Sequence, residues 1–62
     1  MPLVTIRILE GRTVGQNRDM VKKVCAAVCD SLGTPPEKVR IDIVHMANEN
    51  YSIGGKLIID SK

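Results

Sequence analysis

The sequence predicts a small α/β (α+β) protomer: a βαβ unit with parallel strands, followed by a C-terminal hairpin arm. β-Branched and apolar residues alternate along Leu3–Leu9 and again along Val39–Met46, as in two strands. Between them, apolar residues recur with helical spacing. After the second strand, Gly54-Gly55 separates two short apolar runs, which is typical of a hairpin. With 62 residues in all, we expect one domain spanning residues 1–62.

The first strand has two different faces. Val4, Ile6 and Ile8 fall on one side, and the other side holds Leu3, Thr5, Arg7 and Leu9. Glu10-Gly11-Arg12 then ends the strand. Thr13-Val14-Gly15-Gln16 fits the capping box, in which a Thr hydroxyl and a Gln amide satisfy free backbone groups at a helix start.

The predicted helix carries one apolar stripe. Its members are Met20, Val21, Val24, Cys25, Val28 and Leu32. Gly33 suits a helix end, and Pro35-Pro36 cannot continue the helix.

The second strand leaves one face of the sheet without a cover. A strand–helix–strand crossover of this length predicts a right-handed parallel unit, whose helix packs on the purely apolar face. The opposite face would hold Leu3, Thr5, Arg7 and Leu9 beside Arg40, Asp42, Val44 and Met46. Parallel sheets are rarely open on one side, and so short a chain is marginal alone. We therefore expect a homo-oligomer in which another subunit covers this face.

The tail is predicted to be an arm. It opens with a polar loop at Asn48-Glu49-Asn50, and the glycine pair leads into a strand-like run over Lys56–Ile59. A hairpin this short is not stable alone, so we expect it to dock on a neighbour.

Composition excludes several classes of partner. Nine Lys/Arg against seven Asp/Glu give a net charge of only +2, too balanced for the basic face that nucleic-acid binding requires. Tyr51 is the single aromatic residue, so a stacking platform for single strands is absent. No apolar run is long enough to span a membrane, and no signal-peptide pattern occurs. We expect a cytoplasmic protein that binds neither nucleic acid nor membrane.

Metal and cofactor sites are not expected. Cys25 and Cys29 lie four apart in the helical pattern and are interpreted as small packing residues in the reduced state. His45 continues a strand pattern as a buried or edge residue, and no second histidine completes a metal site. Gly54-Gly55 is not a dinucleotide-binding loop, no Walker sequence appears, and no serine lies in a nucleophile elbow.

The N-terminus offers a possible base. Removal of Met1 would leave Pro2 with a secondary amine at the start of a strand. Burial or a nearby cation would lower the pKa of such an amine and leave it neutral at physiological pH. From the residues alone, a Met-Pro start more often has no function.

Four segments together resemble the 4-oxalocrotonate tautomerases. They are Pro2, the stretch Ile8-Leu9-Glu10-Gly11-Arg12, the stretch Val39-Arg40-Ile41, and Tyr51-Ser52-Ile53-Gly54-Gly55. The similarity covers nearly the whole chain without gaps. It implies βαβ protomers that pair into four-stranded dimers, with three dimers forming a hexamer.

The resemblance also implies roles for single residues. The free amine of Pro2 would be the general base that moves a proton between an enol oxygen and a carbon of a 2-hydroxymuconate-like diacid, a substrate of aromatic hydrocarbon catabolism. Arg12 would hold the distal carboxylate. Arg40 would bind the other carboxylate and the carbonyl oxygen. Tyr51 stands where the family usually has phenylalanine, as a wall of the site. These groups come from more than one subunit in the family, and no cofactor is implied.

Physical chemistry agrees with these roles. A guanidinium group binds a carboxylate through two charge-assisted hydrogen bonds, and a cation near the enolate oxygen stabilises charge that grows in the transition state. Without the resemblance, Arg12 is better interpreted as a solvated turn residue and Arg40 as an interface ion pair.

Two alternatives stay open. One is a dehalogenase or hydratase of the same superfamily acting on an unsaturated acid. Ile53 and Leu9 weigh against it, because one dehalogenase branch places an acid and another arginine in those regions. The other alternative is a non-catalytic oligomeric binding module, which would not need a free Pro2 amine.

Overall fold

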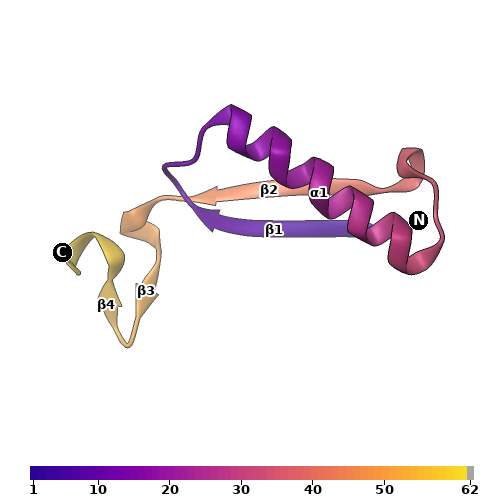
Figure 1. The fold of residues 1–62 in the computed structure, drawn as a ribbon. Coiled ribbons are helices and arrows are strands. Elements are labelled where there is room, and N and C mark those ends of the chain that lie inside the picture. The colour runs from indigo at the N-terminus through magenta and orange to yellow at the C-terminus, as the bar shows by residue number, and fades with distance from the viewer. Residues whose placement is uncertain (62) are drawn as a thin grey trace.

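The computed structural model describes residues 1–61 and has two layers plus an arm (Figure 1). One helix lies across a two-stranded sheet, and a small hairpin extends beyond one end of the sheet. The helix and strands, in chain order, are β1 (Leu3–Leu9), α1 (Val14–Leu32), β2 (Arg40–Met46), β3 (Ser52–Ile53) and β4 (Lys56–Leu57). The predicted α+β protomer is therefore confirmed.

β1 and β2 pair in parallel, as the sequence predicts. The register runs from Leu3 opposite Arg40 to Leu9 opposite Met46. The second strand begins one residue later than Val39, because the Val39 N–H donates to the carbonyl of Pro36 at 3.1 Å and closes a 3₁₀ turn there. The helix-facing side of the sheet holds the exposed His45 at one end and five half-buried apolar residues, Val4, Ile6, Ile8, Ile41 and Ile43.

The helix starts and ends at the predicted signals. The Gln16 N–H donates to Thr13 Oγ1 at 3.0 Å, and the Thr13 N–H donates to Gln16 Oε1 at 2.9 Å, which completes the capping box. Beyond the last turn, Gly33 adopts φ 67°, a left-handed conformation that favours glycine, and its N–H donates to Cys29 at 2.9 Å.

The predicted apolar stripe is wrong at its last member. Met20, Val21, Val24, Cys25 and Val28 are half-buried against the sheet, but the side chain of Leu32 is 67% exposed. A 19-residue helix is about 28 Å long, whereas a seven-residue strand spans about 23 Å. The last turn of α1 therefore extends past the start of β1, and no strand lies beneath it (Figure 1).

The second face of the sheet is uncovered among the described residues. Leu3 is 72% exposed there. The Thr5 hydroxyl donates to Asp42 Oδ1 at 2.8 Å, and an Arg7 guanidinium N–H lies 3.8 Å from Met46 Sδ, so polar side chains pair across the two strands. This face, defined by Leu3, Thr5, Arg7 and Leu9 with Arg40, Asp42, Val44 and Met46, is called the open face below.

The arm contains the predicted hairpin in a shorter form. Gly54 and Gly55 have φ values of 62° and 85°, the positive values that a tight two-residue hairpin turn requires. The expected strand over Lys56–Ile59 is wrong beyond Leu57. Residues 58–60 form a 3₁₀ turn instead. The Ile58 N–H still donates to the carbonyl of the extended residue Tyr51 at 2.9 Å, but the residues before Tyr51, 48–50, form a 3₁₀ turn and offer no extended backbone for further pairing. The predicted polar loop at 48–50 thus has local helical structure.

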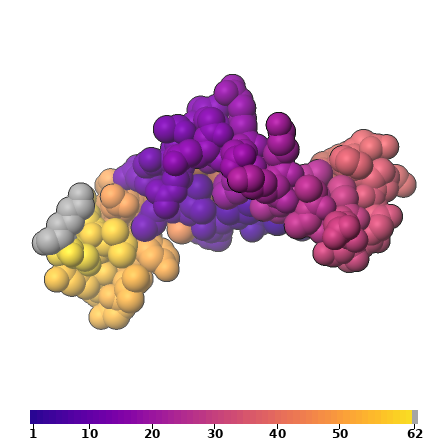
Figure 2. All heavy atoms as spheres, in the orientation of Figure 1, coloured from indigo at the N-terminus to yellow at the C-terminus, as the bar shows by residue number. Residues whose placement is uncertain are grey.

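The described chain has no core of its own. None of its residues is fully buried, and its accessible surface is 4757 Å², compared with about 4000 Å² for an average folded monomer of this mass. The radius of gyration is 14.7 Å, whereas about 11 Å is usual for a domain of this length. Figure 2 shows the elongated shape, with the arm at one end. This protomer therefore needs contacts with other chains to bury its apolar surface.

We expect the protein to associate at micromolar concentration through the open face. A Leu3→Glu substitution should shift sedimentation toward smaller species, because it replaces an exposed apolar side chain, which a neighbouring subunit is expected to bury, with a charge. Ala27→Glu, on the exposed side of α1, is the matched control and should leave the assembly intact. Sedimentation of the unmodified chain as a stable monomer would contradict the prediction.

Candidate active site

Pro2 and Arg40 lie together at one end of the sheet. Pro2 is half-buried directly before β1, and its carbonyl oxygen accepts a hydrogen bond of 3.0 Å from the Arg40 N–H. The parallel register starts at this point, with Leu3 opposite Arg40. Two candidate residues that are 38 positions apart in the sequence are thus neighbours in space.

The Arg40 side chain lies at the surface on the open face. Its guanidinium Nη1 donates to the Glu37 carbonyl oxygen at 2.8 Å. That carbonyl belongs to the 3₁₀ turn over Pro36–Lys38, which connects the helix to β2. One donor is engaged in this bond, which leaves the rest of the planar fork available for an anionic ligand.

Arg12 lies at the opposite end of the sheet. It belongs to the short connection between β1 and α1, where Gly11 has a φ of 111°. Seven strand residues separate this connection from Pro2, a span of about 23 Å. A single protomer therefore does not bring Arg12 to the Pro2 amine.

Tyr51 is on the same end as Arg12. It precedes β3 at the base of the arm, which follows the C-terminal end of β2 (Figure 1). Its carbonyl oxygen accepts a hydrogen bond of 2.9 Å from the Ile58 N–H, and its side chain is 38% exposed. The four candidates thus form two pairs at opposite ends of the protomer.

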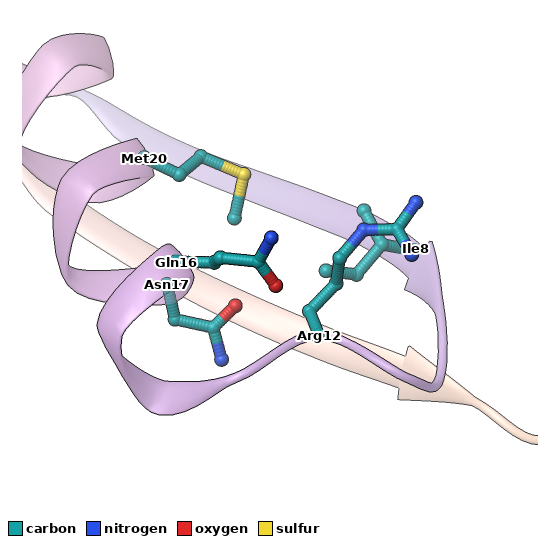
Figure 3. A pocket seen from close by; sticks show the side chains of 5 residues that line it. All are labelled: Ile8, Arg12, Gln16, Asn17 and Met20. Carbon is teal, nitrogen blue, oxygen red and sulfur yellow. The ribbon is translucent and has the colours of Figure 1, made fainter.

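A pocket of about 180 Å³ is lined in part by Arg12 (Figure 3). It lies between the sheet and the first turns of α1, and its lining consists of Ile8, Arg12, Gln16, Asn17 and Met20. Behind it, Asn17 Nδ2 lies 3.2 Å from His45 Nε2 on β2. His45 is an exposed residue of an edge strand, in agreement with one of its two predicted placements.

Sequence reasoning identified Arg12 in this pocket but missed Asn17. The available signal was position: Asn17 lies three residues before Met20 and four before Val21, so it continues the apolar stripe with a polar side chain. A half-buried amide in such a stripe needs partners, and this one contacts His45.

The two cysteines are unbonded packing residues. Cys25 Sγ and Cys29 Sγ are 4.0 Å apart and both side chains are half-buried. Burial against the sheet raises the pKa of the Cys29 thiol, and its hydrogen bond with Cys25 acts in the same direction. Within residues 1–61, no three His, Cys, Asp or Glu side chains are grouped as metal ligands, and no helix is long and apolar enough to cross a bilayer.

We expect slow alkylation of Cys29 at neutral pH, because the thiolate is the reactive form and a raised pKa makes it scarcer. The raised pKa also means that this thiol stabilises the fold while it stays protonated, and that its contribution is lost as the pH rises through the folded-state pKa. Mass spectrometry after iodoacetamide treatment measures the rate. A rate equal to that of a free cysteine peptide at pH 7 would contradict the prediction.

Comparison with known proteins gives one consistent result. The sequence model of the family described as "Tautomerase enzyme" matches residues 2–61. A Bacillus subtilis protein named 2-hydroxymuconate tautomerase is 42% identical over 60 residues, which cover 97% of each chain. The crystal structure of YwhB, a homologue of 4-oxalocrotonate tautomerase, superposes with a TM-score of 0.91 at 41% identity and covers 95% of this chain and 97% of that one. A heterohexameric 4-oxalocrotonate tautomerase from Chloroflexus aurantiacus gives a TM-score of 0.94 at 26% identity, with both chains fully covered.

Proposed function

The chain belongs to the tautomerase family of enzymes, and we propose that it is an isomerase that interconverts 2-hydroxy-2,4-dienedioates, such as 2-hydroxymuconate, with their 2-oxo-3-enoate forms. The observation that supports this proposal is the backbone hydrogen bond from the Arg40 N–H to the Pro2 carbonyl, because it makes the two residues neighbours at one end of the sheet. The relative named 2-hydroxymuconate tautomerase supports the choice of substrate.

Pro2 is proposed as the general base. Once Met1 is removed, its nitrogen becomes a secondary amine that accepts a proton in its neutral form. The amine takes the proton from the enol oxygen of the substrate and returns it to a carbon of the conjugated chain, so that no atom is gained or lost overall. Half-burial of Pro2 favours the neutral amine, because desolvation disfavours the charged form.

The two arginines are proposed to hold the two ends of the diacid. Arg40, next to Pro2, would bind the near carboxylate and the oxygen on C2, where negative charge develops. Arg12 would bind the distal carboxylate, and Tyr51 would form part of the wall beside it. Because Arg12 and Tyr51 lie a strand length from Pro2, they must come from a neighbouring protomer in this scheme.

A hexamer made of three dimers fits this scheme. An antiparallel neighbour along the sheet would bring its Arg12 end to the Pro2 end of the first protomer. The open face and the arm would then be covered by further copies. The relative from Chloroflexus aurantiacus is a heterohexamer, which supports the number of subunits.

The test is an absorbance assay with 2-hydroxymuconate on protein whose mass shows that it begins at Pro2. We expect rapid loss of the enol absorbance. A processed, oligomeric protein without activity on this substrate would contradict the proposed reaction, and full retention of small-acid binding without turnover would favour the binding-module alternative.

A further inference from the structure

A single hydrogen bond connects the arm to the sheet. The Asn48 N–H donates to Glu10 Oε2 at 3.2 Å. The other hydrogen bonds made by residues 48–61 stay within that segment or reach only the adjacent Ala47. Among the described residues, the Glu10 side chain therefore supplies the one hydrogen bond between residues 1–46 and the arm.

The Asn48 N–H needs an acceptor from another segment. Asn48 is half-buried and begins the 3₁₀ turn that the Asn50 N–H closes by donating to the Ala47 carbonyl at 2.8 Å. The first N–H of such a turn has no partner inside it, and the methyl side chain of Ala47 cannot accept a hydrogen bond. A carboxylate is a suitable acceptor, because its bond to an N–H is charge-assisted.

Glu10 is itself held in place by its backbone. Its N–H donates to the Met46 carbonyl at 2.8 Å and extends the pairing of the two strands by one residue. Glu10 thus binds the chain that leads into the arm at two points, through its backbone and through its side chain. Figure 1 shows the connection after β1 and the base of the arm at the same end of the sheet.

The Glu10–Asn48 bond lies between the two candidate residues at this end. Arg12 follows Glu10 by two positions and is followed by Thr13, which the capping box holds, so Arg12 lies between two anchored residues. Tyr51 follows Asn48 by three positions. Glu10 is also the acidic residue nearest to Arg12 in the sequence, yet within residues 1–61 no ion pair joins Arg12 to a carboxylate.

We propose that Glu10 is a positioning residue: its carboxylate holds the Asn48 N–H, fixes Arg12 and Tyr51 relative to each other, and leaves the Arg12 guanidinium unpaired for the distal carboxylate of the substrate. Groups held in advance lose less conformational freedom on binding, which lowers KM. The role toward substrate rests on the function proposed above, whereas the connection between the arm and the sheet does not.

The kinetic test compares two substrates on Glu10→Ala. With 2-hydroxymuconate, KM should rise by about 3- to 10-fold while kcat stays within about twofold, because the lost bond positions binding groups and does not touch the reacting atoms. With 2-hydroxy-2,4-pentadienoate, which lacks the distal carboxylate, KM should not change. Equal losses with the two substrates would show a merely structural role and overturn the proposal.

Two further variants separate the hydrogen bond from the charge. Glu10→Gln keeps an oxygen acceptor and should restore most of the KM for the diacid. Glu49→Ala removes an exposed carboxylate from the same 3₁₀ turn and should leave both substrates unaffected. A KM in Glu49→Ala as high as in Glu10→Ala would mean that the charge of this region matters and not the bond, which overturns the proposal.

The donor can be removed without changing the Glu10 side chain. Asn48→Pro deletes the N–H at a position that accepts proline, because Asn48 is the second residue of the turn and Ala47 before it is extended, with φ −67° and ψ 147°. KM for the diacid should rise as in Glu10→Ala, whereas Asn48→Ala, which keeps the N–H, should be normal. The double variant Glu10→Ala/Asn48→Pro should be no worse than either single variant, since both remove one bond. Additive losses, or dissociation of the oligomer in both single variants, would overturn the proposal.

A readout without turnover separates this proposal from the proposed function. In nuclear magnetic resonance spectra of the oligomer, the Asn48 N–H should exchange with water about tenfold faster in Glu10→Ala than in the unmodified protein. The same exchange in both proteins overturns the proposal whatever the activity. If instead the exchange differs but the processed enzyme does not convert 2-hydroxymuconate, the Glu10–Asn48 bond stands and the proposed reaction fails.

Discussion

Protein that keeps Met1 is expected to lose tautomerase activity, while its oligomeric state stays the same. In that form the Pro2 nitrogen is part of an amide bond, so its electron pair is delocalised and does not accept a proton. The Met1 side chain is 84% exposed and precedes the strand that carries Pro2, so it would also occupy the space before the amine. General-base catalysis typically contributes about 100- to 10,000-fold, which sets the scale of the loss.

The comparison needs one assay on two preparations of defined N-terminal mass. The preparation that begins at Pro2 should show kcat/KM rising with pH as its amine loses a proton, because only the neutral amine acts as the base. The Met1-bearing preparation should show no such rise. Equal turnover of 2-hydroxymuconate by both would mean that Pro2 is not the base.

Local sequence rules predicted most of the fold. The period-two pattern of β1 assigned the correct faces, and the pairing of Val4 with Ile41 and of Ile6 with Ile43 places both apolar faces under the helix. The Thr13 capping box and the Gly33 turn fixed the two ends of α1 because each depends on a few neighbouring residues.

The errors lie where the outcome depends on what is packed nearby. Leu32 continues a helical stripe, but the strand beneath the helix is too short to cover it. Ile59 has strand propensity, but the residues opposite the end of the hairpin form a 3₁₀ turn and have no extended backbone to pair with it. A short stretch of sequence shows neither the length of the strand beneath the helix nor the conformation of the segment opposite the hairpin strand.

The candidate site was predictable only in part, because it too depends on contacts between segments that are far apart in the sequence. The resemblance named Pro2, Arg12, Arg40 and Tyr51, and the structure adds that they form two pairs at opposite ends of a protomer. Periodicity could not identify Asn17 as part of the pocket, because its side chain contacts His45, which is 28 positions away in the sequence. Contacts between distant segments are what the fold supplies.

Substitution of Arg40 should cause the second largest loss of activity, after retention of Met1. Arg40→Ala removes the guanidinium that is proposed to bind the C2 oxygen, so the charge that develops on that oxygen would no longer be stabilised. A charge-assisted hydrogen bond is worth about 1.5–3 kcal/mol, so kcat should fall by roughly 10- to 150-fold. Arg40→Lys keeps the charge but not the planar fork, and should recover part of the rate.

Arg12→Ala is the informative partner of that experiment, because its expected contact is the same in the ground state and in the transition state. Its main effect should be a higher KM, with kcat much less changed than in Arg40→Ala. The contrast follows from the proposed positions: the Arg40 backbone is hydrogen-bonded to Pro2, whereas Arg12 lies about a strand length away and would have to come from another protomer to bind the far end of the diacid. Steady-state kinetics of both variants with 2-hydroxymuconate measure it. Equal and negligible effects would remove both residues from the site, and a dominant loss of kcat in Arg12→Ala would exchange their roles.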